Sequence, residues 1–448
     1  MSFSELPPPP EVEPGQDLPE LRTRPPGPQS RTWLLRLSRT AAPMGPAPGF
    51  DPLRGIHSEA RPWTIVYATA KGCNVLDVDG NRYVDLAAGF GAQLLGHAHP
   101  RIQKVIELQA PRLLQALGDL HPADATIALM ERLAKLHPAA SARVILGLTG
   151  ADAVTAALKT AMLCTGRPGV LAFEGAYHGL GYGPLRACGL RPGYREPFSP
   201  QLGTPARFLP YPASADAAEQ ALERARFELA RGDIGALLFE PILGRGGVVV
   251  PPEGFLAEVC AMARTAGALV VADEIWTALG RAGSWLASHE HGPDLVCLGK
   301  GLGGGLPISA CIGSDRVMSA WRRDPEVVHT STFSGAPLSA ATAIATLDVL
   351  KRDDLVARSA RVGAAFREQL ARRFVGRKPV RDVRGSGLMI GIDSSEPGSA
   401  SRWCRRLLER GYITTTGGGD RDVLVLTPPL DISERLLTAF CDAFDECL

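Results

Sequence analysis

Between about residues 125 and 315, short apolar runs alternate with longer segments in which apolar residues recur at helical spacing. Continuous apolar runs of this length are typical of strands that are buried on both faces, and helices between such strands build a mostly parallel sheet covered on both sides. The pattern therefore predicts an α/β fold. We expect strands at 142–148, 169–175, 235–241, 268–274, 295–300 and 308–313, and helices at 151–164, 217–232 and 255–267.

The two ends of the chain have a different pattern. Residues 1–52 are rich in proline and predict an extended arm that is largely disordered at its start. Two strand-like runs around the turn at 79–81 predict a β-hairpin. After about residue 338, helical patterns and short strands indicate a second, smaller α+β unit. We expect an arm at 1–52, an N-terminal segment contributing to the small domain at 53–110, a large domain at 111–338 and a C-terminal small domain at 339–448.

Composition restricts the class of protein further. The 448 residues carry a net charge of +1, so there is no electrostatic reason to expect binding to nucleic acid or to an anionic membrane. No apolar run approaches the roughly 20 residues of a membrane-spanning helix, and the short run at 33–37 is interrupted by Arg36 and is no secretory signal. The nine cysteines form no CxxC pair, so neither a disulfide framework nor a metal site is expected. We expect a cytoplasmic protein.

One lysine is unusual in its position. Only seven of the 48 basic side chains are lysines, and Lys300 lies between an apolar run and a glycine-rich stretch. Because the chain otherwise uses arginine for positive charge, a lysine here indicates amine chemistry: an amine can lose its proton and attack a carbonyl carbon, whereas a guanidinium cannot. The alternative is a lysine that reaches solvent from a strand end.

Other polar residues follow the neighbouring strands. In an open parallel sheet, ligands bind beyond the carboxyl ends of the strands. A glycine turn, an aromatic ring, carboxylates and the lysine are therefore expected to converge on one edge of the sheet. The stretches concerned are 149–151, 175–179, 240–241, 273–274 and 299–300.

Each of these groups has a candidate role. The backbone amides of Gly150 and Ala151 open a predicted helix and could cradle a phosphate at its positive end. Asp273 ends an apolar strand, so its carboxylate needs a partner. That partner is either a protonated pyridine nitrogen or, alternatively, a helix N-terminus or an arginine such as Arg281. Tyr177 could stack on a flat ring or simply belong to the core.

Two further residues belong to the same candidate site. His178 could contact a cofactor or only support the turn, and Glu240 could be a second polar contact or only an acid at a strand end. A phosphate, a flat ring, a carboxylate for its nitrogen and a lysine amine together describe a site for pyridoxal 5'-phosphate. The sequence therefore predicts this cofactor.

The motifs that contain these residues resemble those of the class III aminotransferases, the ornithine, acetylornithine, diaminobutyrate and 4-aminobutyrate group of the fold-type-I pyridoxal phosphate enzymes. The resemblance runs from about residue 60 to the C-terminus. The motifs are DGNRYVDLAAGFGAQLLGHAHP (79–100), TGADAVTAALK (149–159), FEGAYHG (173–179), EPILGRGGVVVPP (240–252), ADEIWTALGRAG (272–283), CLGKGLGGGLPISA (297–310) and HTSTFSGAPLSAA (329–341).

The resemblance implies a fold and roles for individual residues. It implies a large cofactor-binding domain, a small domain from both chain ends, and an obligate homodimer with the active site at the subunit interface. Lys300 would be the Schiff-base lysine and the base that moves the substrate proton, and Asp273 would pair with the pyridine nitrogen. The turn at 149–151 would hold the phosphate, together with Thr332 of the partner subunit, and Tyr177 would stack on the ring.

Four positions depart from the family pattern. Relatives that use 2-oxoglutarate place an arginine three residues before the PPL motif for the substrate carboxylate, and here this position is Val425. Where many relatives carry an acid that pairs with this arginine, the chain has Arg245. Our hypothesis is that Arg245 binds the carboxylate of one substrate as a bidentate pair; the alternative is that it points to solvent or to a backbone carbonyl. Trp276 replaces a glutamine near the cofactor ring and implies a differently shaped pocket, and Ala336 replaces an asparagine with no consequence that we can derive.

The sequence is compatible with three functions. The leading one is an aminotransferase that moves an amino group from a primary amine or amino acid to an oxo acid in two half-reactions. The second is a racemase or epimerase of the same family, which need not accept 2-oxoglutarate and is compatible with Val425. The third is a catalytically silent dimer, against which Lys300 and Asp273 count because neither is needed for packing.

Overall fold

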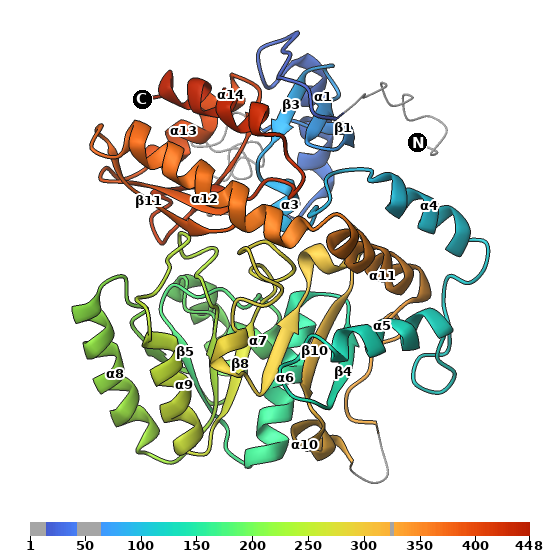
Figure 1. The fold of residues 1–448 in the computed structure, drawn as a ribbon, viewed down its shortest axis with the longest axis vertical. Helices are drawn as coiled ribbons and strands as arrows, with labels where there is room; N and C mark the ends of the chain where they lie inside the picture. The colour runs from blue at the N-terminus through green and yellow to red at the C-terminus, as the bar shows by residue number, and fades with distance from the viewer. Residues whose placement is uncertain (1–14, 43–63, 323–326) are drawn as a thin grey trace.

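A computed structural model describes residues 15–42, 64–322 and 327–448, and its centre is a seven-stranded sheet (Figure 1). The strand order is β4-β10-β9-β8-β7-β5-β6, and β10 alone runs antiparallel to its neighbours. The predicted, mostly parallel sheet is confirmed, and six of its strands were predicted to within about two residues. The strands are β4 (Ala142–Gly147), β5 (Gly169–Phe173), β6 (Arg207–Leu209), β7 (Ile234–Phe239), β8 (Leu269–Asp273), β9 (Leu295–Leu298) and β10 (Ser309–Ser314).

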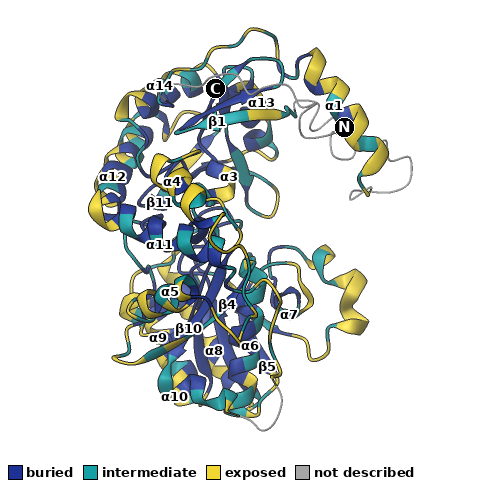
Figure 2. Cartoon of the chain, turned by 90° about the vertical axis from the view of Figure 1, so that its right-hand side faces the viewer, coloured by how far each residue is buried: buried dark blue, intermediate teal, exposed yellow. Residues whose placement is uncertain are grey.

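Helices cover both faces of this sheet because its strands are apolar on both sides (Figure 2). Successive side chains of a strand point to opposite faces. In β7, Leu237 packs in one core cluster with two helices, and Leu238 packs in another cluster with a third helix. The first face is covered by α8 (Ala215–Leu229) and α9 (Phe255–Thr265), and the second by α6 (Gly150–Thr165).

A second unit follows helix α11 (Pro337–Arg352) and lies above the large sheet in Figure 1. Its four-stranded antiparallel sheet has the order β11-β12-β15-β14. The predicted second, smaller α+β unit is therefore confirmed. The elements are α12 (Leu355–Phe374), β11 (Val380–Ser386), β12 (Met389–Ser394), α13 (Ser399–Leu408), β13 (Tyr412–Ile413), β14 (Thr415–Gly417), β15 (Val423–Leu426) and α14 (Glu434–Asp445).

Both ends of the described chain build a third sheet. The predicted hairpin is confirmed: β2 (Asn74–Asp77) and β3 (Arg82–Asp85) pair antiparallel around the turn at 79–81. Strand β1 (Tyr67–Lys71) pairs with β2, and β13, from the C-terminal part of the chain, pairs in parallel with β3. N-terminal and C-terminal segments therefore share backbone hydrogen bonds.

The described part of the N-terminal arm is not extended throughout, which corrects the prediction from sequence. Residues Pro28–Thr40 form helix α1, which begins with a proline, a residue favoured in the first turn of a helix. The carboxylate of Asp79, in the hairpin turn, accepts hydrogen bonds from the amides of Gln29 and Ser30 and so satisfies two of the free amides at the start of this helix. The predicted disorder at the start of the arm, residues 1–14, lies outside the described residues.

The remaining helices are short or lie at the periphery. Within the described ranges, no helix is both long and apolar enough to cross a membrane. These elements are α3 (Ala88–Gly91), α4 (Pro100–Gln109), α5 (Asp124–Ala134), α7 (Tyr182–Leu185) and α10 (Asp315–Met318), and the 3-10 turns at Pro192–Tyr194, Glu196–Gln201, His289–His291, Lys300–Gly303 and Ser319–Trp321.

Candidate active site

Lys300 lies directly beyond the end of β9, in the middle of the large sheet. Its backbone has a left-handed φ of 43°, a conformation that is unfavourable for a residue with a side chain and that often marks a functional site. Its ammonium nitrogen lies 4.5 Å from the centre of the Trp276 ring. Burial lowers the pKa of Lys300 to about 8, although the carboxylates of Asp273 and Glu240 act in the opposite direction. Lys300 is therefore not a strand-end lysine in free solvent.

Asp273 forms a buried pair with His178. Its Oδ2 accepts a hydrogen bond of 2.7 Å from Nδ1 of His178, and its Oδ1 accepts one of 3.1 Å from the amide of Ile275. Because Nδ1 donates to a carboxylate, His178 fixes the orientation of Asp273. The alternative pairing of Asp273 with Arg281 is not observed, since the Arg281 guanidinium is buried and donates to the carbonyl of Leu388.

Glu240 connects two loops of the site. Its Oε1 accepts from the amide of Tyr177 at 2.8 Å, and its Oε2 accepts from the amide of Gly244 at 3.0 Å. Burial raises the pKa of Glu240 to about 7. The residue is thus more than an acid at a strand end, because it holds the turn that carries Tyr177 against the loop that leads to Arg245.

The glycine turn before α6 lies beside the end of β9, where Lys300 follows. Thr149 caps the helix by accepting from the amide of Asp152, whose carboxylate in turn accepts from the amide of Thr149. A Cβ atom on Gly150 would lie 2.6 Å from Cδ1 of Ile275, and one on Gly299 would lie 3.6 Å from Cα of Gly150. No side chain therefore fits at Gly150. The amides of Gly150 and Ala151 are the first of the helix and lie at its positive end, where they could donate hydrogen bonds to a phosphate.

Trp276 fits between two glycines that sequence reasoning did not connect with it. A Cβ atom on Gly91 would lie 2.4 Å from its Nε1, and one on Gly244 would lie 2.3 Å from its Cε3. The indole is 7% exposed, and its Nε1 is buried without a hydrogen-bond partner among the described residues. Val425 belongs to the same apolar cluster, so the two departures from the family pattern occupy one region.

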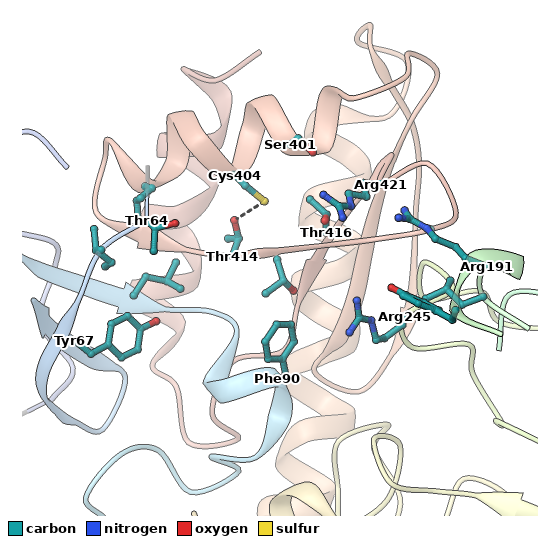
Figure 3. A pocket seen from close by; sticks show the side chains of 17 residues that line it. Thr64, Tyr67, Phe90, Arg191, Arg245, Ser401, Cys404, Thr414, Thr416 and Arg421 are labelled. Carbon is teal, nitrogen blue, oxygen red and sulfur yellow. Dashed lines mark hydrogen bonds between the residues drawn. The ribbon is translucent and has the colours of Figure 1, made fainter. Parts of the chain in front are cut away.

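Arg245 lies on the wall of a cavity and packs against Tyr177. The centre of the Arg245 guanidinium is 4.8 Å from the centre of the Tyr177 ring, a cation–π contact. Of the two predicted alternatives for Arg245, the structure therefore favours a position inside the site. The cavity, of about 530 Å³, is also lined by Arg191 and Arg421, which the sequence analysis missed (Figure 3).

Thr332 is the one predicted cofactor contact that the structure leaves outside this group. It is exposed, and its carbonyl accepts a hydrogen bond from the side chain of Gln115. Its predicted contact with the phosphate in a partner subunit stays a prediction.

The residues fit pyridoxal phosphate. The turn at 149–151 provides helix amides in a place that side chains cannot fill, Asp273 provides a fixed carboxylate, and Lys300 provides an amine of lowered pKa. The Nε1 atom of Trp276 is a buried donor that a ligand group could satisfy. Fold and site together define an enzyme of the pyridoxal phosphate-dependent kind.

Comparison with known proteins identifies the family. The model of the class-III aminotransferases matches residues 56–448, and the chain belongs to this family. It is 35% identical to the acetylornithine aminotransferase of Methanothermobacter thermautotrophicus over 84% of this chain and 92% of that protein. The alanine/serine racemase of Pyrococcus horikoshii is 28% identical over 94% of this chain and 90% of that protein. The predicted cofactor and transamination are thereby confirmed.

A solved structure agrees with this assignment. An amine transaminase from an uncultivated Pseudomonas species, in its pyridoxal phosphate-bound form, is 28% identical with a TM-score of 0.81. The match covers 92% of this chain and 99% of that chain. The present chain is therefore an aminotransferase, which moves an amino group from a primary amine or amino acid to an oxo acid.

Proposed function

We propose that Lys300 is the covalent anchor of the cofactor and moves the substrate proton, and that Asp273 pairs with the pyridine nitrogen. The observation that carries this proposal is the buried Asp273–His178 pair beside an amine of lowered pKa. When bound, pyridoxal phosphate supplies an electron sink for the charge left on a substrate carbon after its proton is removed.

The chain's own residues supply the positions and the base. With a pKa of about 8, Lys300 Nζ is uncharged in a larger fraction of molecules near neutral pH than an ordinary lysine, so it can accept a proton from a substrate carbon and return it. Asp273 is held by His178, so that its carboxylate cannot turn away from a protonated ring nitrogen. The amides of Gly150 and Ala151 would hold the phosphate, and Tyr177 would stack on the ring.

For one substrate we propose a carboxylate contact at Arg245. In the described chain this arginine has no carboxylate within salt-bridge distance, and its guanidinium lies over Tyr177. The usual arginine position holds Val425, which is 1% exposed in an apolar cluster. A cation at Arg245 therefore supports a relocated carboxylate contact.

A racemase remains the second candidate, favoured by Val425 and by the racemase relative. The two functions differ in the fate of the cofactor. An aminotransferase converts it to the amine form when an amino donor is added without an acceptor, which is visible as loss of the absorbance of the lysine-bound form, and a racemase retains that absorbance. We expect the loss, and persistence of the absorbance with every reactive amino acid would favour the racemase.

The proposal includes a homodimer with the active site at its interface. The stretch around residues 113–120 exposes several leucines, with Leu117 at 60% and Leu120 at 72%, and Phe333 next to Thr332 is 58% exposed. Exposed apolar residues of this kind in one region are typical of a protein interface. A second subunit would cover them and bring Thr332 to a phosphate. We also propose a cytoplasmic location and the four-part division of the chain given above.

The test of the anchor is chemical. Borohydride reduction of the holoenzyme followed by peptide mapping is expected to place the cofactor label on Lys300. The Lys300→Ala variant should carry no label, and the control Lys104→Ala, at an exposed lysine of α4, should be labelled like the wild type. A label on another lysine, or none in the wild type, contradicts the proposal.

A further inference from the structure

The ammonium group of Lys300 lies over the face of an aromatic ring. Its nitrogen is 4.5 Å from the centre of the Trp276 indole, a distance typical of a cation–π contact. Among the described residues this nitrogen forms no ion pair and donates no hydrogen bond. Within that part of the chain, the indole face is therefore the protein group that contacts the charge of Lys300 directly.

A second lysine of the chain is held differently. The nitrogen of Lys159 is 5.8 Å from the centre of the Trp321 ring, and it also donates a hydrogen bond to the carbonyl of Val328. A hydrogen-bond acceptor fixes both the position of an ammonium and the direction of one N–H bond. A ring face attracts the charge over its whole area and leaves the N–H bonds free to turn. Lys300 has the contact that allows it to move.

Packing holds the indole in this position. Cβ atoms on Gly91 and Gly244 would lie 2.4 and 2.3 Å from its ring atoms, so the ring fits closely against both glycines. The side chain is 7% exposed, and its Nε1 has no hydrogen-bond partner in the described chain. The glutamine that many relatives carry at this position has no aromatic face, so the contact with Lys300 comes from the departure at Trp276.

The reaction creates a charge that such a contact stabilises. When Lys300 takes a proton from a substrate carbon, the C–H bond breaks, its electron pair stays with the substrate and the cofactor, and Nζ gains an N–H bond and a positive charge. Burial and the charge of Arg245 disfavour the ammonium, whereas the carboxylates of Asp273 and Glu240 favour it. A cation–π contact favours the ammonium as well, and it is stronger where water is excluded.

We propose that Trp276 is a positioning residue of the reaction, whose indole face holds Lys300 while this side chain carries the substrate proton. Because the attraction extends over the ring face, the ammonium can move from the carbon that gives the proton to the atom that receives it and keep the contact. This inference deepens the proposed function and rests on it, since it takes Lys300 as the group that moves the proton.

The test measures the pKa of Lys300 in the full-length holoenzyme with its cofactor in the amine form, in which the lysine is not bound to the cofactor. Trace labelling with acetic anhydride over a range of pH, followed by peptide mapping, gives the pKa of Lys300 and of the exposed Lys104 as an internal standard. The protein is compared with one in which every tryptophan is 6,7-difluorotryptophan. Fluorine withdraws electron density from the ring face, and the two substituted carbons are not the ring atoms nearest to Gly91 and Gly244.

Fluorination should lower the pKa of Lys300 by about 0.2 to 0.5, which is a loss of about 1.5- to 3-fold in proton affinity, and should leave the pKa of Lys104 unchanged. The matched control is the Trp276→Phe variant, in which fluorination of the remaining tryptophans should leave the pKa of Lys300 unchanged. An unchanged pKa of Lys300 in the fluorinated wild type, or an equal fall in the fluorinated Trp276→Phe variant, overturns the proposal.

Two substitutions give a second readout. Trp276→Phe keeps an aromatic face, and Trp276→Leu replaces it with an aliphatic side chain. We expect the pKa of Lys300 to be lower in the Leu variant than in the Phe variant by about 0.5 to 1, because only the Phe variant retains a cation–π contact. Equal pKa values, or a higher one in the Leu variant, would show that the ring acts only through its volume, which overturns the proposal.

The two proposals fail in different ways. If borohydride reduction labels Lys300 and fluorination leaves the pKa of this lysine unchanged, only the role of Trp276 is wrong. If borohydride reduction does not label Lys300, the proposed function is wrong, whatever fluorination shows.

Discussion

Removing the charge of Lys300 should stabilise the protein without its cofactor. A drop of the Lys300 pKa from 10.5 to about 8 means that the folded protein disfavours the ammonium by about 3.5 kcal/mol, at roughly 1.4 kcal/mol per pH unit. The Lys300 residue is half-buried, and solvent reduces this figure, so about 3.5 kcal/mol is an upper value. The Lys300→Met variant keeps the length of the side chain and removes the charge. At pH 7 we therefore expect its apoprotein to be about 1–3 kcal/mol more stable than the wild type.

The change of this stability difference with pH is a more specific test than its value at pH 7. Between pH 8 and 10.5 the unfolded chain holds the Lys300 proton and the folded chain has lost it. The unfolded state then binds more protons, so the stability of the wild type rises with pH across this window. The advantage of Lys300→Met should accordingly be largest below pH 8 and should disappear by about pH 10.5.

The assay is urea unfolding of the apoproteins at intervals from pH 7 to 10.5. Lys104→Met, at a lysine that is 60% exposed, serves as the control and should stay within about 0.5 kcal/mol of the wild type throughout. A Lys300→Met protein that is no more stable at pH 7, or whose advantage does not change with pH, would refute the reasoning.

Three further predictions follow from the site. Asp273→Asn should keep the cofactor and lower kcat on the order of 100-fold, because a neutral amide no longer favours a protonated ring nitrogen; an unchanged kcat in steady-state kinetics would contradict this. Gly150→Ala should weaken cofactor binding and destabilise the protein by about 1–3 kcal/mol, measured by cofactor titration and urea unfolding, because its Cβ would meet Ile275 at 2.6 Å. Val425→Arg should cost about 3–5 kcal/mol as a buried unpaired charge. Combined with Trp276→Gln it should cost about 1–3 kcal/mol less, and additive unfolding free energies would rule out a shared space.

The ends of the strands could be predicted from sequence because their signal is local. An apolar run that stops at Asp273 or shortly before Lys300 shows where a buried strand ends, and the parallel arrangement then brings such ends together. The hydrogen bonds formed at these strand ends could not be predicted from the sequence. That Glu240 accepts from the amides of two separate loops depends on the folded positions of both loops, and an acid before a proline carries no sign of it.

The features that the sequence did not predict depend on contacts between segments that are far apart in the chain. Arg191 and Arg421 are 230 residues apart and share no periodic pattern, so only the folded chain shows that they line one cavity. Strand β6 is three residues long and begins with an arginine, which leaves too short an apolar run to recognise. Helix α1 was hidden by the prolines around it, because its N-terminus is satisfied by Asp79 from another segment.

The parallel pairing of β3 with β13 has a consequence for biosynthesis. Val84 has Tyr412 as its partner in the ladder, about 330 residues later in the chain. On a ribosome, β3 therefore emerges long before the strand that completes its edge. Glu20 can pair with Arg82 early, but the amides of Val84 and Leu86 on the same edge stay open while the entire central sheet is being made. A nascent chain of this enzyme has an exposed strand to protect, and chaperone dependence should fall sharply once the last segment is released.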